Sequence, residues 1–216
     1  MLVGHLGAGL AAKAVAPRVG LGTLVAAALL LDIILWLFVI LHVEGAAVPG
    51  DFAERHTLAF SFPWSHSLTG ALVWAAAAAF VWTWSGGEGR YFAFAPAVIA
   101  ATVLSHWVLD FLVHPAELPL WGPGSPAVGL GLAQPTALIV ELAIAALGFG
   151  AFALRSRLSL GRRAVVGGLT LAVAALTVFG ATSTTPPADI LNLAGVSLLA
   201  LFAIIAVAAA ADREAR

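Results

Sequence analysis

The 216-residue chain contains no cysteine, and only 10% of its residues are charged. The absence of cysteine excludes disulfides, thiolate metal ligands and cysteine nucleophiles. Soluble domains carry roughly a quarter charged residues, so such a low charge content excludes an ordinary soluble globule. Ten basic and eleven acidic residues give a formal net charge of −1, which provides no basic surface for nucleic acid. We therefore expect no nucleic-acid partner.

Hydrophobic residues make up 62% of the chain, and they gather in runs close to the ~20 residues that cross a bilayer as a helix. Segments rich in glycine and proline separate these runs. Because lipid cannot satisfy an open sheet edge, the runs predict helices. The fold class predicted is all-α, a polytopic transmembrane helical bundle in contact with the lipid bilayer. Six spans are expected, at residues 19–42, 64–84, 91–114, 134–154, 164–180 and 190–211.

Residues 2–16 are apolar but too short for a full span. Their basic residue, Lys13, follows the apolar part, which is the reverse of the order in a signal peptide. We predict a short N-terminal helix, inserted from the cytoplasmic side and ended by Pro17.

Basic residues predict the orientation of the bundle. Nine of the ten fall on one side if the six spans alternate, and Arg55 is the exception. The positive-inside rule then places the N-terminal basic residues and the C-terminus in the cytoplasm, with the loops at 43–63 and 115–133 outside.

The chain divides by composition into two segments. Residues 1–154 hold every ionisable side chain inside the predicted spans and form a site-bearing membrane bundle. Residues 155–216 form a C-terminal pair of transmembrane helices without such groups. We interpret this pair as structural, and as the surface available for a homo-oligomer contact.

Ionisable side chains within spans are the main functional signal, because a charge at the centre of a span costs about 2.5–3.5 kcal/mol on insertion scales. At 1.5 Å per residue, His106 and Glu141 lie at a similar depth, about 10–12 Å from the outer ends of their helices. Mutual pairing would offset part of this cost. The candidate site residues are His5, Asp32, His66, His106, Asp110, His114 and Glu141.

The sharpest spacing is His106-x-x-x-Asp110-x-x-x-His114. Residues four apart share one helix face and can present an imidazole and a carboxylate to one ion. Such ligands without thiolates suit a divalent metal, with zinc favoured and manganese or iron as alternatives. A metal with an open position makes hydrolysis the natural chemistry, and Glu141 is the candidate general base.

Other interpretations compete with this one. His106 and Asp110 could form a structural pair, Asp32 could serve packing, and Ser65 could cap a helix and leave His66 at the interface. The side chains of His42, Glu44, Asp51, Glu54, Arg55 and His56 are interpreted as interfacial or loop positions. The rival functions are a proton- or metal-coupled transporter that uses the same buried groups, a bis-histidine haem protein and a purely structural membrane subunit.

The order of motifs over residues 1–145 resembles the bacterial membrane-bound, metal-dependent hydrolase-like family, also called LexA-binding inner-membrane hydrolases. The resemblance implies a multi-pass protein of the bacterial inner (plasma) membrane, with His5, Asp32, His66, His106 and Asp110 as metal ligands. We expect the substrate to be an amphiphilic ester or phosphoester near the outer leaflet. The motifs that carry the resemblance are Gly4-His-Leu-Gly-Ala-Gly-Leu-Ala-Ala-Lys, Leu30-Leu-Asp-Ile-Ile-Leu-Trp, Pro63-Trp-Ser-His-Ser-Leu, Ser105-His-Trp-Val-Leu-Asp-Phe-Leu-Val-His, Leu118-Pro-Leu-Trp and Gly129-Leu-Gly-Leu.

The chain departs from this family at two places. Many members have Pro-Asp where this chain has Leu31-Asp32, which changes the backbone only locally. Many have an arginine just before a Thr-His-Ser, in the segment that here reads Pro63-Trp-Ser-His-Ser. The second departure removes a group that could bind an anion.

Overall fold

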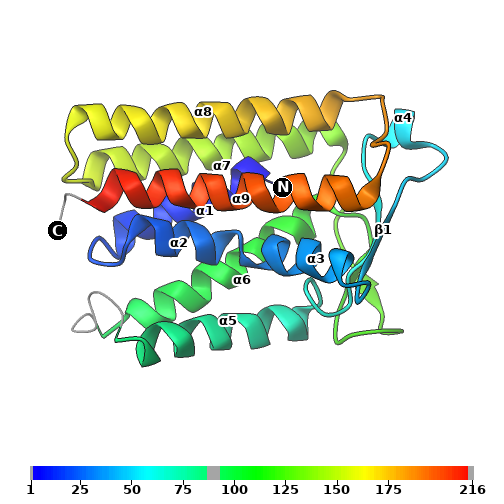
Figure 1. The fold of residues 1–216 in the computed structure, drawn as a ribbon, viewed down its shortest axis with the longest axis horizontal. Helices are drawn as coiled ribbons and strands as arrows, with labels where there is room; N and C mark the ends of the chain where they lie inside the picture. Colours follow the sequence, from blue (N-terminus) through cyan, green and yellow to red (C-terminus); the bar gives the residue numbers. More distant parts are fainter. Residues whose placement is uncertain (1, 87–92, 214–216) are drawn as a thin grey trace.

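The computed structural model describes residues 2–86 and 93–213 as a bundle of elongated helices, with short strands at one end (Figure 1). We call this the loop end, because segments 41–67 and 114–133 lie there. The opposite end carries Lys13 and Arg162 and is called the basic end. The helices are α1 (Leu2–Val15), α2 (Leu21–Ala28), α3 (Leu30–Ile40), α4 (Phe52–Arg55), α5 (Leu68–Trp84), α6 (Ala95–Val113), α7 (Gln134–Arg155), α8 (Leu160–Thr182) and α9 (Ile190–Asp212).

Among the described residues, four helices are long and apolar enough to cross a membrane, namely α6, α7, α8 and α9. The pair α2 and α3 meets the same test jointly but is bent by 57° at Leu29, and α1 and α5 are shorter apolar helices. The predicted helical bundle is thus confirmed in outline, but the six predicted spans are not confirmed: the described residues contain four candidate spans, or five if the bent pair counts as one. The predicted start of the third run, at residue 91, lies outside the described residues.

The short N-terminal helix is present. Helix α1 begins near the middle of the bundle's length and runs to the basic end (Figure 1). There the Lys13 ammonium donates to the Val19 carbonyl at 2.8 Å and to Asp212 Oδ2 at 2.9 Å. The backbone N–H of Leu21 donates to the same carboxylate oxygen at 2.8 Å. This buried ion pair joins the last turn of α1, the first turn of α2 and the end of α9.

Helices α1 and α7 pack through two glycines. A Cβ placed on Gly148 would lie 2.1 Å from the Gly7 carbonyl oxygen, and one on Gly7 would lie 2.7 Å from the Ala145 Cα. Neither distance is possible for real atoms, so the close approach of the two helices requires glycine at both positions. Glu141, Ala145 and Gly148 share one face of α7, so this crossing also brings α1 beside the Glu141 side chain.

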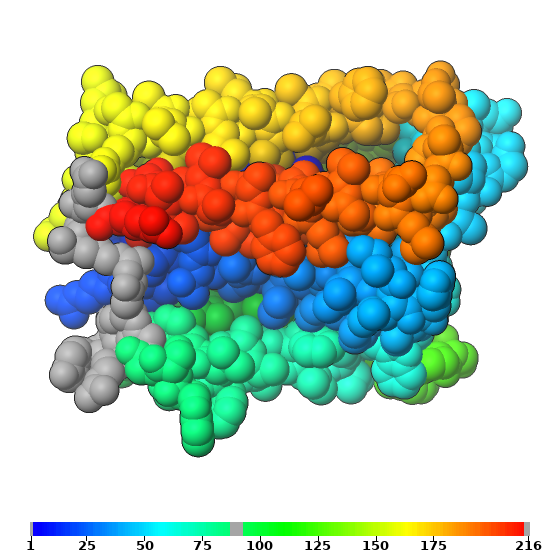
Figure 2. Space-filling model, in the orientation of Figure 1, coloured from blue at the N-terminus to red at the C-terminus, as the bar shows by residue number. Residues whose placement is uncertain are grey.

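The largest apolar cluster of the core contains buried residues from α1, α2, α7, α8 and α9, including Leu6, Leu10, Val166 and Leu201. Both predicted segments of the chain therefore contribute to one core. Figure 2 shows α9 lying across this face of the molecule, between α8 and the α2–α3 pair.

The loop end carries two small antiparallel sheets. Strand β1 (Gly45–Ala47) pairs with β2 (Ala59–Ser61), and β3 (Leu118–Pro119) pairs with β4 (Ala127–Val128). The register Ala46↔Phe60 folds segment 43–63 back onto the bundle, and Phe60 packs beside Phe62 and Trp36 in a third apolar cluster. These short strands depart from a strictly all-α fold. They lie at the loop end of the bundle.

Candidate metal centre

Five of the predicted site residues converge in the interior. His5 comes from α1, Asp32 from the first turn of α3, His66 from the segment before α5, and His106 and Asp110 from α6. The side chains of His5 and His106 are fully buried, those of His66 and Asp110 are 3% exposed, and that of Asp32 is 20% exposed. Groups separated by up to 105 residues in the sequence thus form one cluster, which we call the His/Asp cluster.

One part of the His/Asp cluster is a compact triangle of ligand atoms. The Nε2 atoms of His66 and His106 lie 3.3 Å apart. Each lies 3.4 Å from Oδ2 of Asp110. Oδ1 of Asp32 approaches the same two nitrogens, at 3.8 Å from His66 and 3.7 Å from His106. The arrangement of His66, His106 and Asp110 could hold a metal ion.

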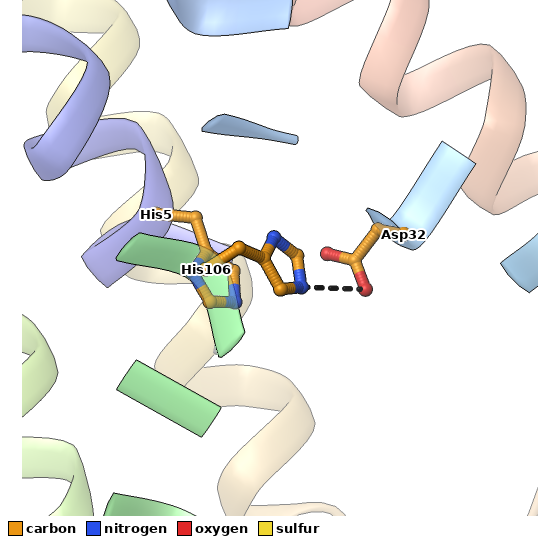
Figure 3. A group of neighbouring side chains, drawn as sticks. All are labelled: His5, Asp32 and His106. Atoms are coloured by element: carbon orange, nitrogen blue, oxygen red, sulfur yellow. Dashed lines mark ion pairs between the residues drawn. The ribbon is translucent and has the colours of Figure 1, made fainter. Parts of the chain in front are cut away.

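A second possible ligand group shares His106 and adds His5 and Asp32. The His5 and His106 rings stack at a centroid distance of 3.6 Å and an interplanar angle of 9°. Figure 3 shows the two rings side by side, with Asp32 on the far side of His106. His5 Nε2 also lies 3.2 Å from Oδ1 of Asp110. His106 therefore belongs to both groups, and Asp110 contacts all three imidazoles.

The break between α2 and α3 positions part of this site. The carbonyl of Ala28, the last residue of α2, lies 2.8 Å from Nδ1 of His106. A carbonyl can only accept, so Nδ1 carries a ring proton, and in the neutral ring Nε2 holds a lone pair directed at the cluster. Asp32 follows in the first turn of α3. Broken helices occur at membrane depth where they line a cavity and their freed backbone groups find partners.

Sequence reasoning missed Glu44, which it assigned to a solvated loop. Its side chain is buried, with the residue 6% exposed. It accepts hydrogen bonds from the backbone N–H groups of Trp64 (2.7 Å) and Ser65 (2.8 Å) and from the Ser65 hydroxyl (2.6 Å). The Ser65 hydroxyl in turn lies 2.8 Å from His66 Nδ1. Burial raises the pKa of the Glu44 carboxyl, while the hydrogen bonds from Ser65 and Trp64 oppose that rise.

The alternative in which Ser65 caps a helix is wrong: the cap is Ser67, whose hydroxyl accepts from the Gly70 N–H at 3.0 Å. Ser65 is therefore available for Glu44 and His66. No short-range sequence signal marks Glu44, because it acts on a residue 22 positions away through the β1–β2 fold.

A cavity of about 710 Å³ adjoins the His/Asp cluster. Asp32, His66, Asp110 and Glu141 line it. Glu141 is 7% exposed, and its Oε2 has no hydrogen-bond partner within residues 2–86 and 93–213. The other lining side chains are largely apolar and include Leu35, Trp36, Phe60, Leu176, Ala200 and Leu201. The cavity thus has a polar inner end and an apolar wall, part of which comes from α8 and α9.

The structure places the remaining histidines apart from the His/Asp cluster. His114 Nδ1 lies 3.7 Å from Oε2 of Glu117, whose Oε1 accepts from Arg55 at 3.4 Å. The His114 side chain lowers the pKa of the Glu117 carboxyl against the effect of burial, and the Arg55 charge lowers it further. His56 Nδ1 lies 2.9 Å from the Ser183 carbonyl. His114 and His56 both line the cavity nearer its loop end.

Comparisons of the chain with protein-family models, with curated proteins and with solved structures return no match.

Proposed function

We propose that this protein is an integral-membrane, metal-dependent hydrolase that cleaves an ester or phosphoester of an amphiphilic substrate. The observation that carries the proposal is the triangle of His66 Nε2, His106 Nε2 and Asp110 Oδ2, with edges of 3.3, 3.4 and 3.4 Å. Two imidazole nitrogens and a carboxylate oxygen this close, inside an apolar bundle, repel one another unless a cation or proton lies between them.

Zinc suits this donor set best. Zinc bonds of about 2.0–2.1 Å in tetrahedral geometry place ligand atoms about 3.3–3.4 Å from one another. The three edges of the triangle match this spacing. Asp32 or His5 would complete the ligand set, and manganese or iron are the alternatives. Such an ion, when bound with an open position, polarises a phosphoryl or acyl oxygen and lowers the pKa of a bound water.

Glu141 is the proposed general base. It lines the same cavity as three cluster residues and is held beside α1 by the Gly7–Gly148 crossing. Its buried Oε2, which lacks a hydrogen-bond partner in the described part of the chain, is free to take a proton from water.

The cavity supports an amphiphilic substrate. Its polar end adjoins the His/Asp cluster, and its apolar wall includes Leu176 of α8 and Leu201 of α9. A headgroup bond can reach the cluster while hydrocarbon lies against that wall. With the basic end in the cytoplasm of a bacterial inner membrane, such a substrate comes from the outer leaflet.

The test compares the wild type with Glu141→Gln in detergent and in vesicles. The amide keeps the shape of the side chain but cannot take a proton, so this variant should retain its metal and lose turnover by about 10²–10⁴-fold. Lipids of defined headgroup and generic phosphoesters are the substrates. Equal turnover of the two proteins would remove Glu141 from the mechanism, and a wild type purified without a divalent metal would contradict the proposal as a whole.

The transporter hypothesis predicts a different result in the same vesicles. It requires ionisable groups at several depths, whereas fully buried apolar residues such as Leu6, Leu10 and Leu24 separate the His/Asp cluster from the Lys13–Asp212 pair. This arrangement favours hydrolysis. Metal-dependent ion flux abolished by Asp32→Asn, with no substrate hydrolysed, would instead support transport.

A further inference from the structure

The contacts of Glu44 form a continuous chain to the His/Asp cluster. Glu44 Oε2 accepts from the Ser65 hydroxyl at 2.6 Å, and the hydroxyl oxygen lies 2.8 Å from His66 Nδ1. On the other side of the same ring, Nε2 lies 3.4 Å from Asp110 Oδ2. All four side chains are buried, with residue exposures of 6% or less. The carboxylate in the β1–β2 region thus connects to the cluster through a single hydroxyl and a single ring.

This chain fixes which ring nitrogen of His66 carries the proton. A hydroxyl has one hydrogen, and the Ser65 hydroxyl gives it to the Glu44 carboxylate, which cannot donate in return. Nδ1 of His66 must then donate to the Ser65 oxygen, so Nδ1 holds the hydrogen of the neutral ring. Nε2 is left with a lone pair, which faces His106 and Asp110.

The two histidines of the triangle are therefore prepared in the same way by different groups. A backbone carbonyl at the α2–α3 break orients His106, and a serine hydroxyl held by Glu44 orients His66. The indole N–H of Trp107 also donates to the His66 carbonyl at 3.0 Å, which fixes the backbone there. Groups that accept a hydrogen bond from the outer ring nitrogen of a ligand histidine set its tautomer and orientation.

We propose that Glu44 is a positioning residue of the metal site, which through Ser65 holds His66 in the Nδ1–H form and so presents Nε2 as a metal ligand. This inference rests on the metal site proposed above. It assigns a role to a loop carboxylate that touches neither the cluster nor the cavity's inner end, and it makes the β1–β2 fold part of the site.

The test is Glu44→Gln, read by ¹⁵N chemical shifts of histidine rings in metal-free, detergent-solubilised protein. The glutamine oxygen can still accept from the Trp64 and Ser65 N–H groups, while its NH₂ replaces Oε2 and donates to the Ser65 oxygen. The Ser65 hydroxyl then donates to His66 Nδ1, and the ring proton moves to Nε2. We expect the His66 signals, identified by their loss in His66→Gln, to change from the Nδ1–H to the Nε2–H pattern.

Zinc titration supplies the second measurement. Loss of the orienting group should weaken zinc binding by about 10- to 100-fold. Ser65→Ala, which leaves Glu44 its two backbone contacts, should weaken zinc binding as well and covers the case in which Glu44→Gln does not fold. Asp51→Asn, an exposed carboxylate on the same loop, is the matched control and should bind zinc like the wild type.

The outcomes separate this inference from the proposed function. An unchanged His66 tautomer together with unchanged zinc affinity in Glu44→Gln overturns the role of Glu44 and leaves the metal site standing. A wild type that binds no zinc, manganese or iron overturns the metal site, while the ring signals of the metal-free protein still decide whether Glu44 sets the tautomer.

Discussion

The half of the bundle toward the loop end and the half toward the basic end differ in what fills their interiors. In the half toward the loop end, three imidazoles and two carboxylates contact one another beside a cavity of about 710 Å³. In the half toward the basic end, fully buried apolar residues such as Leu10 and Val25 fill the space, and the Lys13–Asp212 ion pair lies at its end. The buried polar groups thus gather beside the cavity, and close apolar packing fills the half away from it.

This difference has a physical basis. Apolar packing stabilises a membrane bundle without any polar partner, whereas each buried ionisable group requires one. The Lys13–Asp212 pair obtains its partners locally, from the Val19 carbonyl and the Leu21 N–H. The His/Asp cluster instead combines groups from three separate helices and the segment before α5. Each of these groups must be brought into place by the tertiary fold, which points to a use beyond stability.

The largest expected effect is on metal content. His106 belongs to both possible ligand groups, so His106→Ala should abolish stoichiometric metal binding, measured by elemental analysis of purified protein. Leu10→Ala, in the other half, should lose about 2–5 kcal/mol of stability through the cavity it creates and keep its metal. Metal retained in the first variant, or lost in a folded Leu10→Ala, would remove the contrast between the halves.

The next effect concerns the ion pair of the basic end. Asp212→Asn leaves the part-buried Lys13 ammonium without its carboxylate partner and should destabilise the protein, by less than the about 3–5 kcal/mol expected for a fully buried pair. Metal content should not change. Thermal unfolding in detergent measures the loss, and the double variant Lys13→Met/Asp212→Leu should recover much of it, because apolar residues can replace a buried pair. A double variant no better than the single one would show that the pair itself is needed.

An intermediate effect is expected where the halves are coupled. Gly148→Ala introduces a Cβ that meets the Gly7 carbonyl at 2.1 Å, so α1 must move away from α7. Overpacking of this kind costs about 1–3 kcal/mol, and the displacement of α1 also carries His5. We expect weaker zinc binding together with lower stability. Gly150→Ala, where a Cβ meets nothing within 4 Å, is the control and should match the wild type in both measurements.

The smallest effect concerns Glu117 at the loop end. Its folded-state pKa is lowered by His114 and Arg55, so the stability it contributes is complete above its unfolded pKa and is lost as the pH falls through the folded pKa. Glu117→Gln should therefore remove part of the acid-induced decrease in stability. At neutral pH the loss should stay below about 1 kcal/mol, because solvent screens the pair. Thermal unfolding of the wild type and of Glu117→Gln, measured from about pH 3 to about pH 7, tests this difference in acid sensitivity.

Much of the fold could be predicted because long apolar runs have few alternatives in lipid. The four longest helices and the short α1 follow from run length and from Pro17. The bend at Leu29 could not be predicted in this way, since residues 21–40 contain no proline and Asp32 is the one charged residue in an otherwise largely apolar run. The Ala28 carbonyl at this bend has His106 Nδ1 as its partner, which is 78 residues away in the sequence.

The candidate site likewise contains residues that the sequence could predict and residues that it could not. Asp32, His66, His106 and Asp110 were marked by their unfavourable position in apolar runs, and the structure brings them together with His5. His114, the third residue of the helical spacing, lies at the end of α6 and contacts Glu117 instead. Glu44 stands in a segment where charges are ordinary, so only the tertiary fold identifies it.

Because α8 and α9 supply part of the cavity wall, the segment that carries the candidate site cannot be separated from them without changing the cavity. A fragment ending at residue 154 would carry all of the candidate ligands and the candidate base, and by sequence it would pass for a complete catalytic unit. It would lack Leu176, Thr177 and Leu201, which line the cavity from α8 and α9. Acyl chains of the bilayer would then lie directly against Asp32 and Glu141. The last two helices would thus shield the His/Asp cluster and Glu141 from lipid, and the proposed hydrolysis would depend on residues that take no part in it.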